Sequence, residues 1–311
     1  MRALVTGGNG FVGRHLCAAL RERGDEVVVA GRPHASGVVD LELDLRDFDN
    51  VCAVVAAANA DVVFHLAAIA FVPEGNNDPL TTYDVNVLGT ARVFEAIRRS
   101  PRPVRRALFV GSAEIYGSRP ASAYPLRETS APQPTTPYAA SKTAGEAIAL
   151  AAFRTFGIPA LMTRAFNHIG PGQDDRFALS SFAKQLAEIK NGAPPLMYVG
   201  NLEAQRDFLD VRDVVRAYAL LAERGVDGEA YNVCSGRAVT IKEVLRRLIT
   251  IAGVAVEVRE DPERMRPSDN PLSLGDNAKL REATGWEPTI SLDASLRTVY
   301  EAAVAGVGAH A

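Results

Sequence analysis

Two residues four positions apart, Tyr138 and Lys142, form a pair able to move a proton. They lie in the segment T-P-Y-A-A-S-K-T (136–143), and on a helix this spacing places both side chains on one face. Ser112 precedes them in G-S-A-E-I-Y-G (111–117), at the end of a predicted strand. A phenol beside an ammonium group can donate a proton, and a nearby hydroxyl can hold the oxygen that receives it. The three residues therefore predict a proton-transfer set of the kind that works beside a nicotinamide ring in a hydride-transfer enzyme.

The lysine is expected to change the acidity of the tyrosine. An unperturbed phenol has a pKa of about 10, too high for efficient proton exchange at neutral pH. An ammonium ~5 Å away favours the phenolate by on the order of 3 kcal/mol, or about two pKa units, at an effective dielectric constant of about 20. We therefore predict that Lys142 lowers the pKa of Tyr138. Lys142 can also hydrogen-bond the ribose of a nicotinamide cofactor.

The start of the chain predicts the turn that would hold such a cofactor. The apolar run M-R-A-L-V-T is typical of a buried parallel strand, and a helical pattern follows over 14–23. Between them the glycines fit two frames, G-x-x-G-x-x-G (Gly7, Gly10, Gly13) and G-x-G-x-x-G (Gly8, Gly10, Gly13). Either frame permits a tight turn and close approach of the backbone to a pyrophosphate. The first helical turn then directs free N–H groups at the phosphates. Phe11 and Val12, between the last two glycines, are expected to contact the cofactor as well.

The next strands indicate which dinucleotide is bound. The second strand ends at Gly31-Arg32 without the carboxylate that would accept the ribose 2′-hydroxyl of NAD. Arg32 can instead meet a 2′-phosphate, so we predict NADPH, with NADH as the alternative. The end of the third predicted strand places Asp44 and Leu45 near the adenine. The small-residue end of the fourth (Leu66, Ala67 and Ala68) lets the cofactor pass closely, and His65 is expected to be a packed histidine.

Strand and helix patterns alternate up to about Phe166, which predicts an α/β protein with a doubly wound parallel sheet of the Rossmann type. Long helices are expected over 86–99 and 138–156. Loops rich in Pro and Gly then become common, which predicts a smaller C-terminal lobe. We assign residues 1–165 to a dinucleotide-binding domain, to which 206–235 return, and residues 166–205 and 236–311 to a substrate-binding lobe.

The overall composition argues against several classes of protein. The chain has 311 residues and a formal net charge of −3, so nucleic acid is not an expected partner. Three separated cysteines and five histidines show neither a disulfide framework nor metal-ligand spacing, so we expect no metal. No apolar run approaches ~20 residues and the first strand begins at residue 2. Neither a membrane span nor a signal peptide is therefore expected, and the cytoplasm is the predicted location.

Several motifs together resemble the extended short-chain dehydrogenase/reductases that act on nucleotide sugars, the NAD-dependent epimerase/dehydratase family. They are T-G-G-N-G-F-V-G (6–13), S-A-E-I-Y-G (112–117), Y-A-A-S-K (138–142) and R-A-F-N (164–167). Further motifs are similar to the GDP-4-keto-6-deoxy-D-mannose reductases: F-N-H-I-G-P-G-Q (166–173), V-G-N-L-E-A-Q-R-D-F-L-D (199–210), Y-N-V-C-S-G (231–236), R-P-S-D-N-P (266–271) and T-G-W-E-P (284–288). The resemblance covers essentially the whole chain. It implies NAD(P)H-dependent reduction of the C4 ketone of a GDP-deoxysugar to GDP-D-rhamnose, with Tyr138 as the proton donor.

The same resemblance implies how the substrate is held. Arginine binds diphosphates in a bidentate manner, and Arg206 and Arg266 match the family positions that hold the diphosphate and ribose. Asn167 matches the asparagine that contacts the substrate near the sugar–diphosphate linkage. The remaining candidates are Ser268 and Asp269 beside Arg266, the helix-surface Lys184, and Ser112 at the ketone oxygen. The family also implies a homodimer formed through the two long helices.

Other activities stay open at this point. Glu114 stands two residues after Ser112, where sugar-nucleotide 4,6-dehydratases keep the carboxylate that removes the C5 proton. A GDP-mannose 4,6-dehydratase with Glu114 as its base, or a C4 epimerase, is therefore an alternative. A catalytically silent NADP-binding regulator would have no need of Ser112, Tyr138 and Lys142 together. His168 is expected either to touch the sugar or to stabilise its loop.

Overall fold

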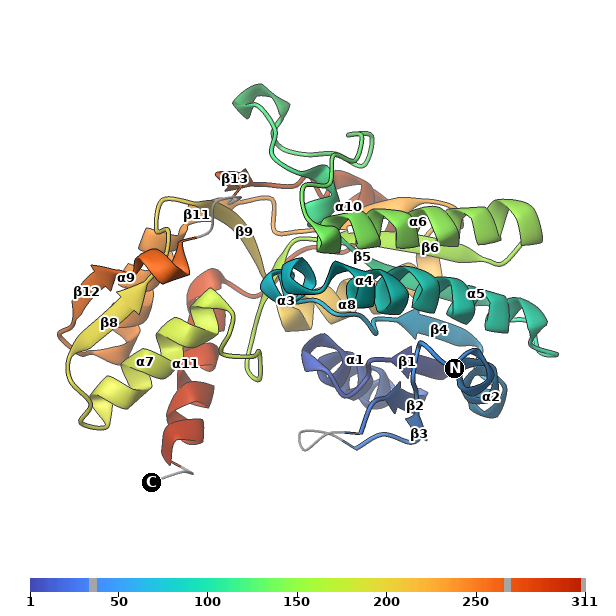
Figure 1. Ribbon diagram of the computed structural model, residues 1–311, viewed down its shortest axis with the longest axis horizontal. Coiled ribbons are helices and arrows are strands. Elements are labelled where there is room, and N and C mark those ends of the chain that lie inside the picture. The colour runs from blue at the N-terminus through green and yellow to red at the C-terminus, as the bar shows by residue number, and fades with distance from the viewer. Residues whose placement is uncertain (34–37, 266–269, 309–311) are drawn as a thin grey trace.

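The computed structural model describes residues 1–33, 38–265 and 270–308, and these form a larger and a smaller lobe (Figure 1). The larger lobe is built on a seven-stranded parallel sheet in the order β10-β6-β5-β4-β1-β2-β3. Its strands are β1 (Arg2–Thr6), β2 (Glu26–Gly31), β3 (Leu41–Glu42), β4 (Val62–His65), β5 (Arg106–Ser112), β6 (Ala160–Ala165) and β10 (Ala230–Val233). The order reverses direction between β1 and β4. A crevice forms at such a point in a doubly wound sheet, beyond the carboxyl ends of the strands.

Helices cover both faces of this sheet, as near-continuous apolar strands require. One face packs against α1 (Phe11–Glu22) and α8 (Val211–Arg224), with α10 (Ala278–Thr284) and the fully buried Trp286 beside them. The other face packs against α2 (Phe48–Ala58), α5 (Gly89–Arg99) and α6 (Pro137–Phe156). The predicted doubly wound α/β architecture and both long helices are thus confirmed.

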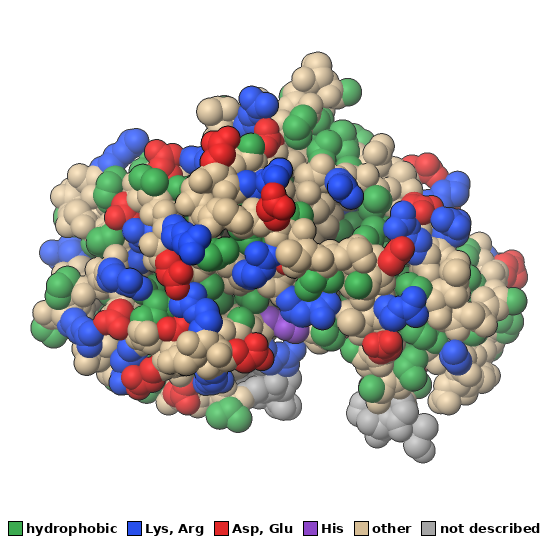
Figure 2. All heavy atoms as spheres, turned by 180° about the vertical axis from the view of Figure 1, so that it is seen from behind, with side chains coloured by type: hydrophobic (Ala, Val, Ile, Leu, Met, Phe, Trp, Pro, Cys, Tyr) green, Lys and Arg blue, Asp and Glu red, His purple; other side chains and the backbone are tan. Residues whose placement is uncertain are grey.

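The smaller lobe has its own core. Its mixed sheet contains β7 (Asn167–Ile169), β9 (Gln205–Asp210), β11 (Ala238–Thr240) and β13 (Leu272–Ser273), and a separate ladder pairs β8 (Leu196–Val199) with β12 (Glu257–Glu260). The helices α7 (Ala178–Lys190), α9 (Ile241–Ala252) and α11 (Leu292–Gly308) bury a cluster that includes Phe182, Leu186, Leu248 and Leu296. Figure 2 shows an indentation between the two lobes on the back of the molecule.

Short elements connect these layers. They are α3 (Val72–Asn77), α4 (Pro79–Tyr83), the π-helix η1 (Asp84–Leu88), and the 3₁₀ turns η2 (Ala113–Tyr116), η3 (Ala121–Ala123) and η4 (Pro262–Arg264). Within the segment expected to return to the first domain, α8 and β10 cover or join the central sheet, whereas β9 belongs to the smaller sheet. Beyond it, α10 packs on α8 and β10. The domain boundaries drawn from the sequence stay a prediction.

Candidate active site

A cleft of about 640 Å³ follows the carboxyl ends of the central strands and reaches β9 and β13 of the smaller lobe. This size suits a cofactor or small-molecule site. All four predicted catalytic residues, Ser112, Glu114, Tyr138 and Lys142, line it. Residues that are far apart in the sequence therefore share one cavity at the place where a doubly wound sheet binds its ligands.

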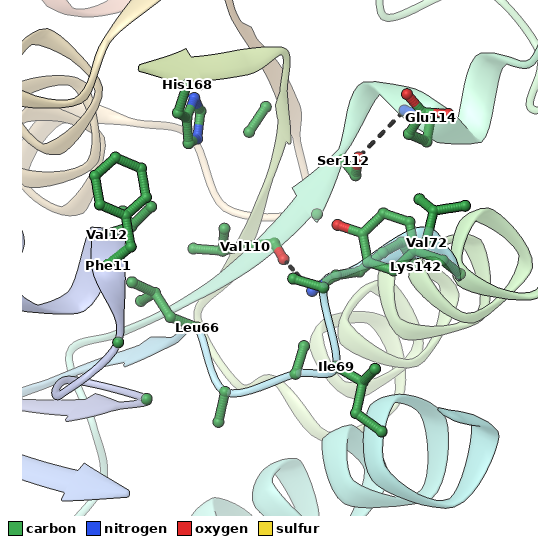
Figure 3. A pocket seen from close by; sticks show the side chains of 18 of the residues that line it. Phe11, Val12, Leu66, Ile69, Val72, Val110, Ser112, Glu114, Lys142 and His168 are labelled. Carbon is green, nitrogen blue, oxygen red and sulfur yellow. Dashed lines mark hydrogen bonds between the residues drawn. The ribbon is translucent and has the colours of Figure 1, made fainter. Parts of the chain in front are cut away.

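Ser112 and Tyr138 meet at the end of β5. Ser112 is the last residue of this strand and is 7% exposed. Its Oγ accepts a hydrogen bond from the backbone N–H of Glu114 at 3.2 Å, which begins the η2 turn (Figure 3). Tyr138 lines the same end of the cleft, and the nearby Ser112 hydroxyl acts to lower the pKa of its phenol. The two residues expected to act on one ketone oxygen therefore face the same cavity.

Local sequence features of α6 place Tyr138 and Lys142. Thr136 caps the helix through Oγ1, which accepts from Ala139 N at 3.1 Å, and Pro137 occupies the first turn. Gly145 faces β5 so closely that a Cβ there would lie 2.5 Å from the Phe109 ring. This close packing buries Lys142 and lets its Nζ donate to Val110 O at 2.9 Å (Figure 3).

The protonation of this pair differs from the sequence prediction. Burial raises the pKa of Tyr138 to about 12, opposed by the nearby Ser112 hydroxyl and reinforced by the charge of Glu114. Burial lowers the pKa of Lys142 to about 8. The predicted lowering of the Tyr138 pKa is therefore wrong, because burial removes the solvation that the charged phenolate needs. Tyr138 carries its proton at neutral pH, as a proton donor must.

The glycine turn after β1 fits a dinucleotide. Gly7 has φ +69°, and a Cβ on it would lie 2.9 Å from backbone atoms of Ala67. A Cβ on Gly13 would lie 2.2 Å from the carbonyl oxygen of Gly7, so neither position accepts a side chain without backbone movement. Gly10 is the N-cap of α1 and no side chain caps this helix, which leaves its first N–H groups for a phosphate. Gly7, Gly10, Phe11 and Val12 line the cleft, whereas Gly13 lies behind it.

The end of β2 bears the residue expected to choose between NADPH and NADH. Arg32 lines the cleft with an exposed guanidinium, 3.6 Å from a carboxylate oxygen of Asp44. Asp44 does not line the cleft and pairs with Arg46 at 2.8 Å, whereas its neighbour Leu45 does line it. Sequence reasoning missed Asn9, whose Nδ2 donates to Arg32 O at 2.7 Å and so fixes this strand end.

The segment after β4 forms the floor of the cleft, where Leu66, Ala67 and Ala68 lie as expected. Asn86, which the sequence did not single out, holds this segment: its Oδ1 accepts from Ile69 N at 2.8 Å and its Nδ2 donates to Ile69 O at 3.0 Å. Its position in a helical pattern gave no sign of this role. His65 is buried between hydroxyls of Thr6 and Thr90, as a packed histidine.

The opposite end of the cleft belongs to the smaller lobe. Asn167 and Arg206 line it, together with Asn270 and Ser273, which sequence reasoning missed. Arg206 Nη1 donates to Asn270 O at 2.6 Å, and Asn270 Nδ2 donates to Gly117 O at 3.1 Å. Lys184 does not line the cleft and pairs with Asp175 at 2.6 Å. The predicted Arg266, Ser268 and Asp269 lie outside the described residues.

His168 faces the catalytic end from β7 (Figure 3). Its Nε2 lies 3.3 Å from the hydroxyl of Tyr218, and its Nδ1 is buried without a hydrogen-bond partner in the described part of the chain. Burial lowers the pKa of His168 to about 4, so the ring is neutral at pH 7. Across residues 1–33, 38–265 and 270–308, no cluster of His, Cys, Asp and Glu has the makings of a metal site.

Comparison with known proteins agrees with this geometry. A family model described as GDP-mannose 4,6 dehydratase matches residues 4–299. The chain is 39% identical to the GDP-6-deoxy-D-mannose reductase of Pseudomonas aeruginosa, over 96% of this chain and 95% of that one. It is 31% identical to the GDP-6-deoxy-D-talose 4-dehydrogenase of Aggregatibacter actinomycetemcomitans, over 92% of each.

A solved structure extends the likeness to three dimensions. The NADPH complex of RMD from Pseudomonas aeruginosa superposes with a TM-score of 0.89 at 36% identity, over 98% of this chain and 100% of that one. The chain therefore belongs to the GDP-mannose 4,6-dehydratase family of extended short-chain dehydrogenase/reductases. The resemblance inferred from its motifs is confirmed.

Proposed function

We propose that this protein reduces the C4 ketone of GDP-4-keto-6-deoxy-D-mannose to GDP-D-rhamnose, with NADPH as the preferred reductant and NADH as an alternative. The observation that carries the proposal is one cleft that joins three parts. These are the glycine turn, the Ser112–Tyr138–Lys142 set and Arg206. The likeness to a GDP-6-deoxy-D-mannose reductase and to an NADPH complex supports the choice of substrate and cofactor.

The residues divide the work of ketone reduction between them. When bound, NADPH supplies the hydride to C4. Ser112 donates a hydrogen bond to the ketone oxygen and holds it beside Tyr138, whose phenol gives up its proton to the developing alkoxide. The ammonium of Lys142 stabilises the phenolate that remains and can bond the nicotinamide ribose. Arg206 pairs with the diphosphate at the other end.

A dehydratase activity is the second candidate because Glu114 lines the cleft next to the catalytic set. Its carboxylate is close enough to Tyr138 to raise the pKa of the phenol. A base in this place would suit removal of the C5 proton of GDP-mannose after oxidation at C4. The higher likeness to a reductase places this activity second.

A paired assay separates the two activities. The purified protein is given GDP-4-keto-6-deoxy-D-mannose with NADPH, and the loss of NADPH absorbance is followed. In parallel, GDP-mannose alone is examined by mass spectrometry for loss of water. Consumption of NADPH without loss of water is expected. Loss of water without net consumption of NADPH would instead make Glu114 the base of a dehydratase.

Assembly and location complete the proposal. We propose a homodimer formed through the two long helices, η1–α5 and α6, on which Leu88 and Phe156 expose 51% and 58% of their surface. Sedimentation of the wild type beside a Leu88→Lys variant tests this, with monomer expected only for the variant. We also propose a cytoplasmic location, to which the three cysteines, all present as free thiols, are suited. No helix in the described part of the chain is long and apolar enough to cross a membrane.

A further inference from the structure

A buried carboxylate lies directly behind the arginine proposed to hold the diphosphate. Asp207 is 0% exposed in β9 and accepts four hydrogen bonds. Its Oδ1 accepts from the backbone N–H of Ser235 at 2.7 Å and from the Ser235 hydroxyl at 2.6 Å. Its Oδ2 accepts from Gly236 N at 3.0 Å and Gly275 N at 3.4 Å. One side chain thus connects three separate segments.

Those segments belong to different parts of the molecule. Ser235 and Gly236 form the turn that follows β10, the last strand of the central sheet, and Gly236 adopts φ +78° there. Gly275 follows β13, whose Ser273 lines the cleft and pairs in register with Arg206. β9 itself runs at the junction of the two lobes (Figure 1). Asp207 therefore fixes β9 to both the larger lobe and the segment that forms the cleft wall.

The neighbouring Arg206 projects in the other direction. Successive side chains in a strand point to opposite faces. Arg206 therefore points into the cleft, whereas Asp207 points into the interior and is fully buried. The Arg206 guanidinium donates to Asn270 O, in the same segment that Asp207 holds through Gly275. Arg206 and Asp207 thus contact the same segment, 270–275, from neighbouring positions of the strand.

The negative charge of Asp207 lowers the free energy of unfolding of the protein. Burial raises the pKa of Asp207 from 3.8 to about 6, opposed by its hydrogen bonds. The folded state therefore binds the proton more tightly than the unfolded state, and stability decreases as the pH rises through this interval. At neutral pH the charged carboxylate persists at a cost in stability.

We propose that Asp207 is a positioning residue for substrate binding, which presents Arg206 to the nucleotide diphosphate by fixing β9 against the 235–236 turn and Gly275. The inference rests on the proposed function, in which Arg206 holds that diphosphate. Asp207 itself does not line the cleft, so it acts through Arg206 and not by contact with the ligand.

The test uses Asp207→Asn, which keeps the shape of the side chain but replaces one acceptor oxygen by an NH₂ group that faces backbone N–H donors. Calorimetry on the NADPH-loaded protein measures GDP affinity, and the dissociation constant is expected to rise about tenfold. Affinity for NADPH is expected to be unchanged. In an Arg206→Ala background, Asp207→Asn should have little further effect, because both changes remove the same interaction.

Two further variants keep the test decisive. Asp213→Asn is the matched control, since Asp213 is 1% exposed and accepts from Thr289 N, Thr289 Oγ1 and Ile290 N, away from the cleft. It should lower the unfolding midpoint without changing GDP affinity. Ser235→Ala removes the hydroxyl donor to Asp207, together with the hydrogen bond that this hydroxyl accepts from Arg237 N, and keeps the Asp207 side chain. It should weaken GDP binding by about threefold, and it replaces Asp207→Asn as the test if that variant does not fold.

The outcomes that overturn the inference are distinct from those that overturn the proposed function. If Arg206→Ala itself leaves GDP affinity unchanged, the assignment of the diphosphate site fails. If Arg206→Ala weakens GDP binding but Asp207→Asn and Ser235→Ala do not, the positioning role fails alone. An undiminished effect of Asp207→Asn in the Arg206→Ala background would equally overturn it.

Discussion

The two ends of the cleft are built in different ways. The catalytic end is formed by strand ends of one parallel sheet and by the first turns of α6. Ser112 ends strand β5, and Lys142 on α6 donates a hydrogen bond to Val110 O of the same strand. The other end brings together Asn167, Arg206 and Asn270 from separate elements at the junction of the lobes. The proposed chemistry thus lies at an end formed by one sheet and the helix packed on it. The proposed binding of the nucleotide lies at an end that depends on contacts between elements distant in the sequence.

The largest effect is expected at the catalytic end. Tyr138→Phe removes the proton donor but keeps the ring, so turnover should fall by roughly 10²–10⁴-fold. NADPH binding, measured by fluorescence titration, should be retained. Tyr83→Phe, at a residue 36% exposed on α4 and outside the cleft, makes the same chemical change and should be silent. Normal turnover of Tyr138→Phe would remove Tyr138 from the mechanism.

Gly13→Ala tests the cofactor turn at the same end. The new Cβ would lie 2.2 Å from Gly7 O, so the turn must move or α1 must shift. Overpacking of this kind costs about 1–3 kcal/mol, and NADPH affinity should fall by more than about tenfold. Gly306→Ala, where a Cβ meets nothing within 4 Å, is the control. Equal NADPH affinity in the two variants would contradict the role of this turn.

The other end of the cleft is tested by Arg206→Ala. Loss of a hydrogen-bonded charge should weaken GDP binding by ~1.5–3 kcal/mol, measured by calorimetry, and leave NADPH affinity unchanged. Arg212→Ala removes a nearby guanidinium that pairs with Asp210 outside the cleft and should have no effect on GDP. A loss of NADPH affinity in Arg206→Ala would contradict the assignment of Arg206 to the nucleotide-sugar end of the cleft alone.

The pH dependence follows from the two buried groups at the catalytic end. Tyr138, with its pKa raised to about 12, stays protonated across the working range. Lys142, with its pKa lowered to about 8, loses its charge as the pH rises through that value and can no longer stabilise the phenolate. Turnover should therefore decline by about tenfold per pH unit above 8. Lys142→Arg, permanently charged, should show a flatter alkaline limb in the same rate profile; an unchanged limb would exclude Lys142 as its origin.

The smallest effect is expected at the rim of the cofactor site. Arg32 is 57% exposed, so Arg32→Ala should weaken NADPH binding by only about fivefold and leave NADH binding unchanged. Arg46→Ala is the control, because Arg46 also pairs with Asp44 but does not line the cleft. Equal losses of affinity for NADPH and NADH would mean that Arg32 does not bind the 2′-phosphate.

Much of the catalytic end was predictable because its signals are local. The strand–glycine–helix order and the i, i+4 spacing of Tyr138 and Lys142 are set by backbone periodicity. These local signals do not reveal how deeply each side chain is buried, and burial sets the pKa of a titratable group. The pKa of Tyr138 moved in the direction opposite to the prediction, because solvation depends on packing that only the folded chain reveals.

Asn86, Asn270 and Asp207 show where sequence reasoning ended. Asn86 lies in a helical pattern, Asp207 in a strand and Asn270 in a loop, and each acts by hydrogen bonds to segments distant in the sequence. The sequence by itself determined the fold class and predicted which residues of the glycine turn and of the proposed catalytic set would line the cleft, because short-range periodicity and residue chemistry are sufficient for that. Only the tertiary structure decided which charges are buried and how Arg206 is held. Those properties arise from packing between elements distant in the sequence, α6 against β5 for Lys142 and the junction of the two lobes for Arg206, and no local pattern records that packing.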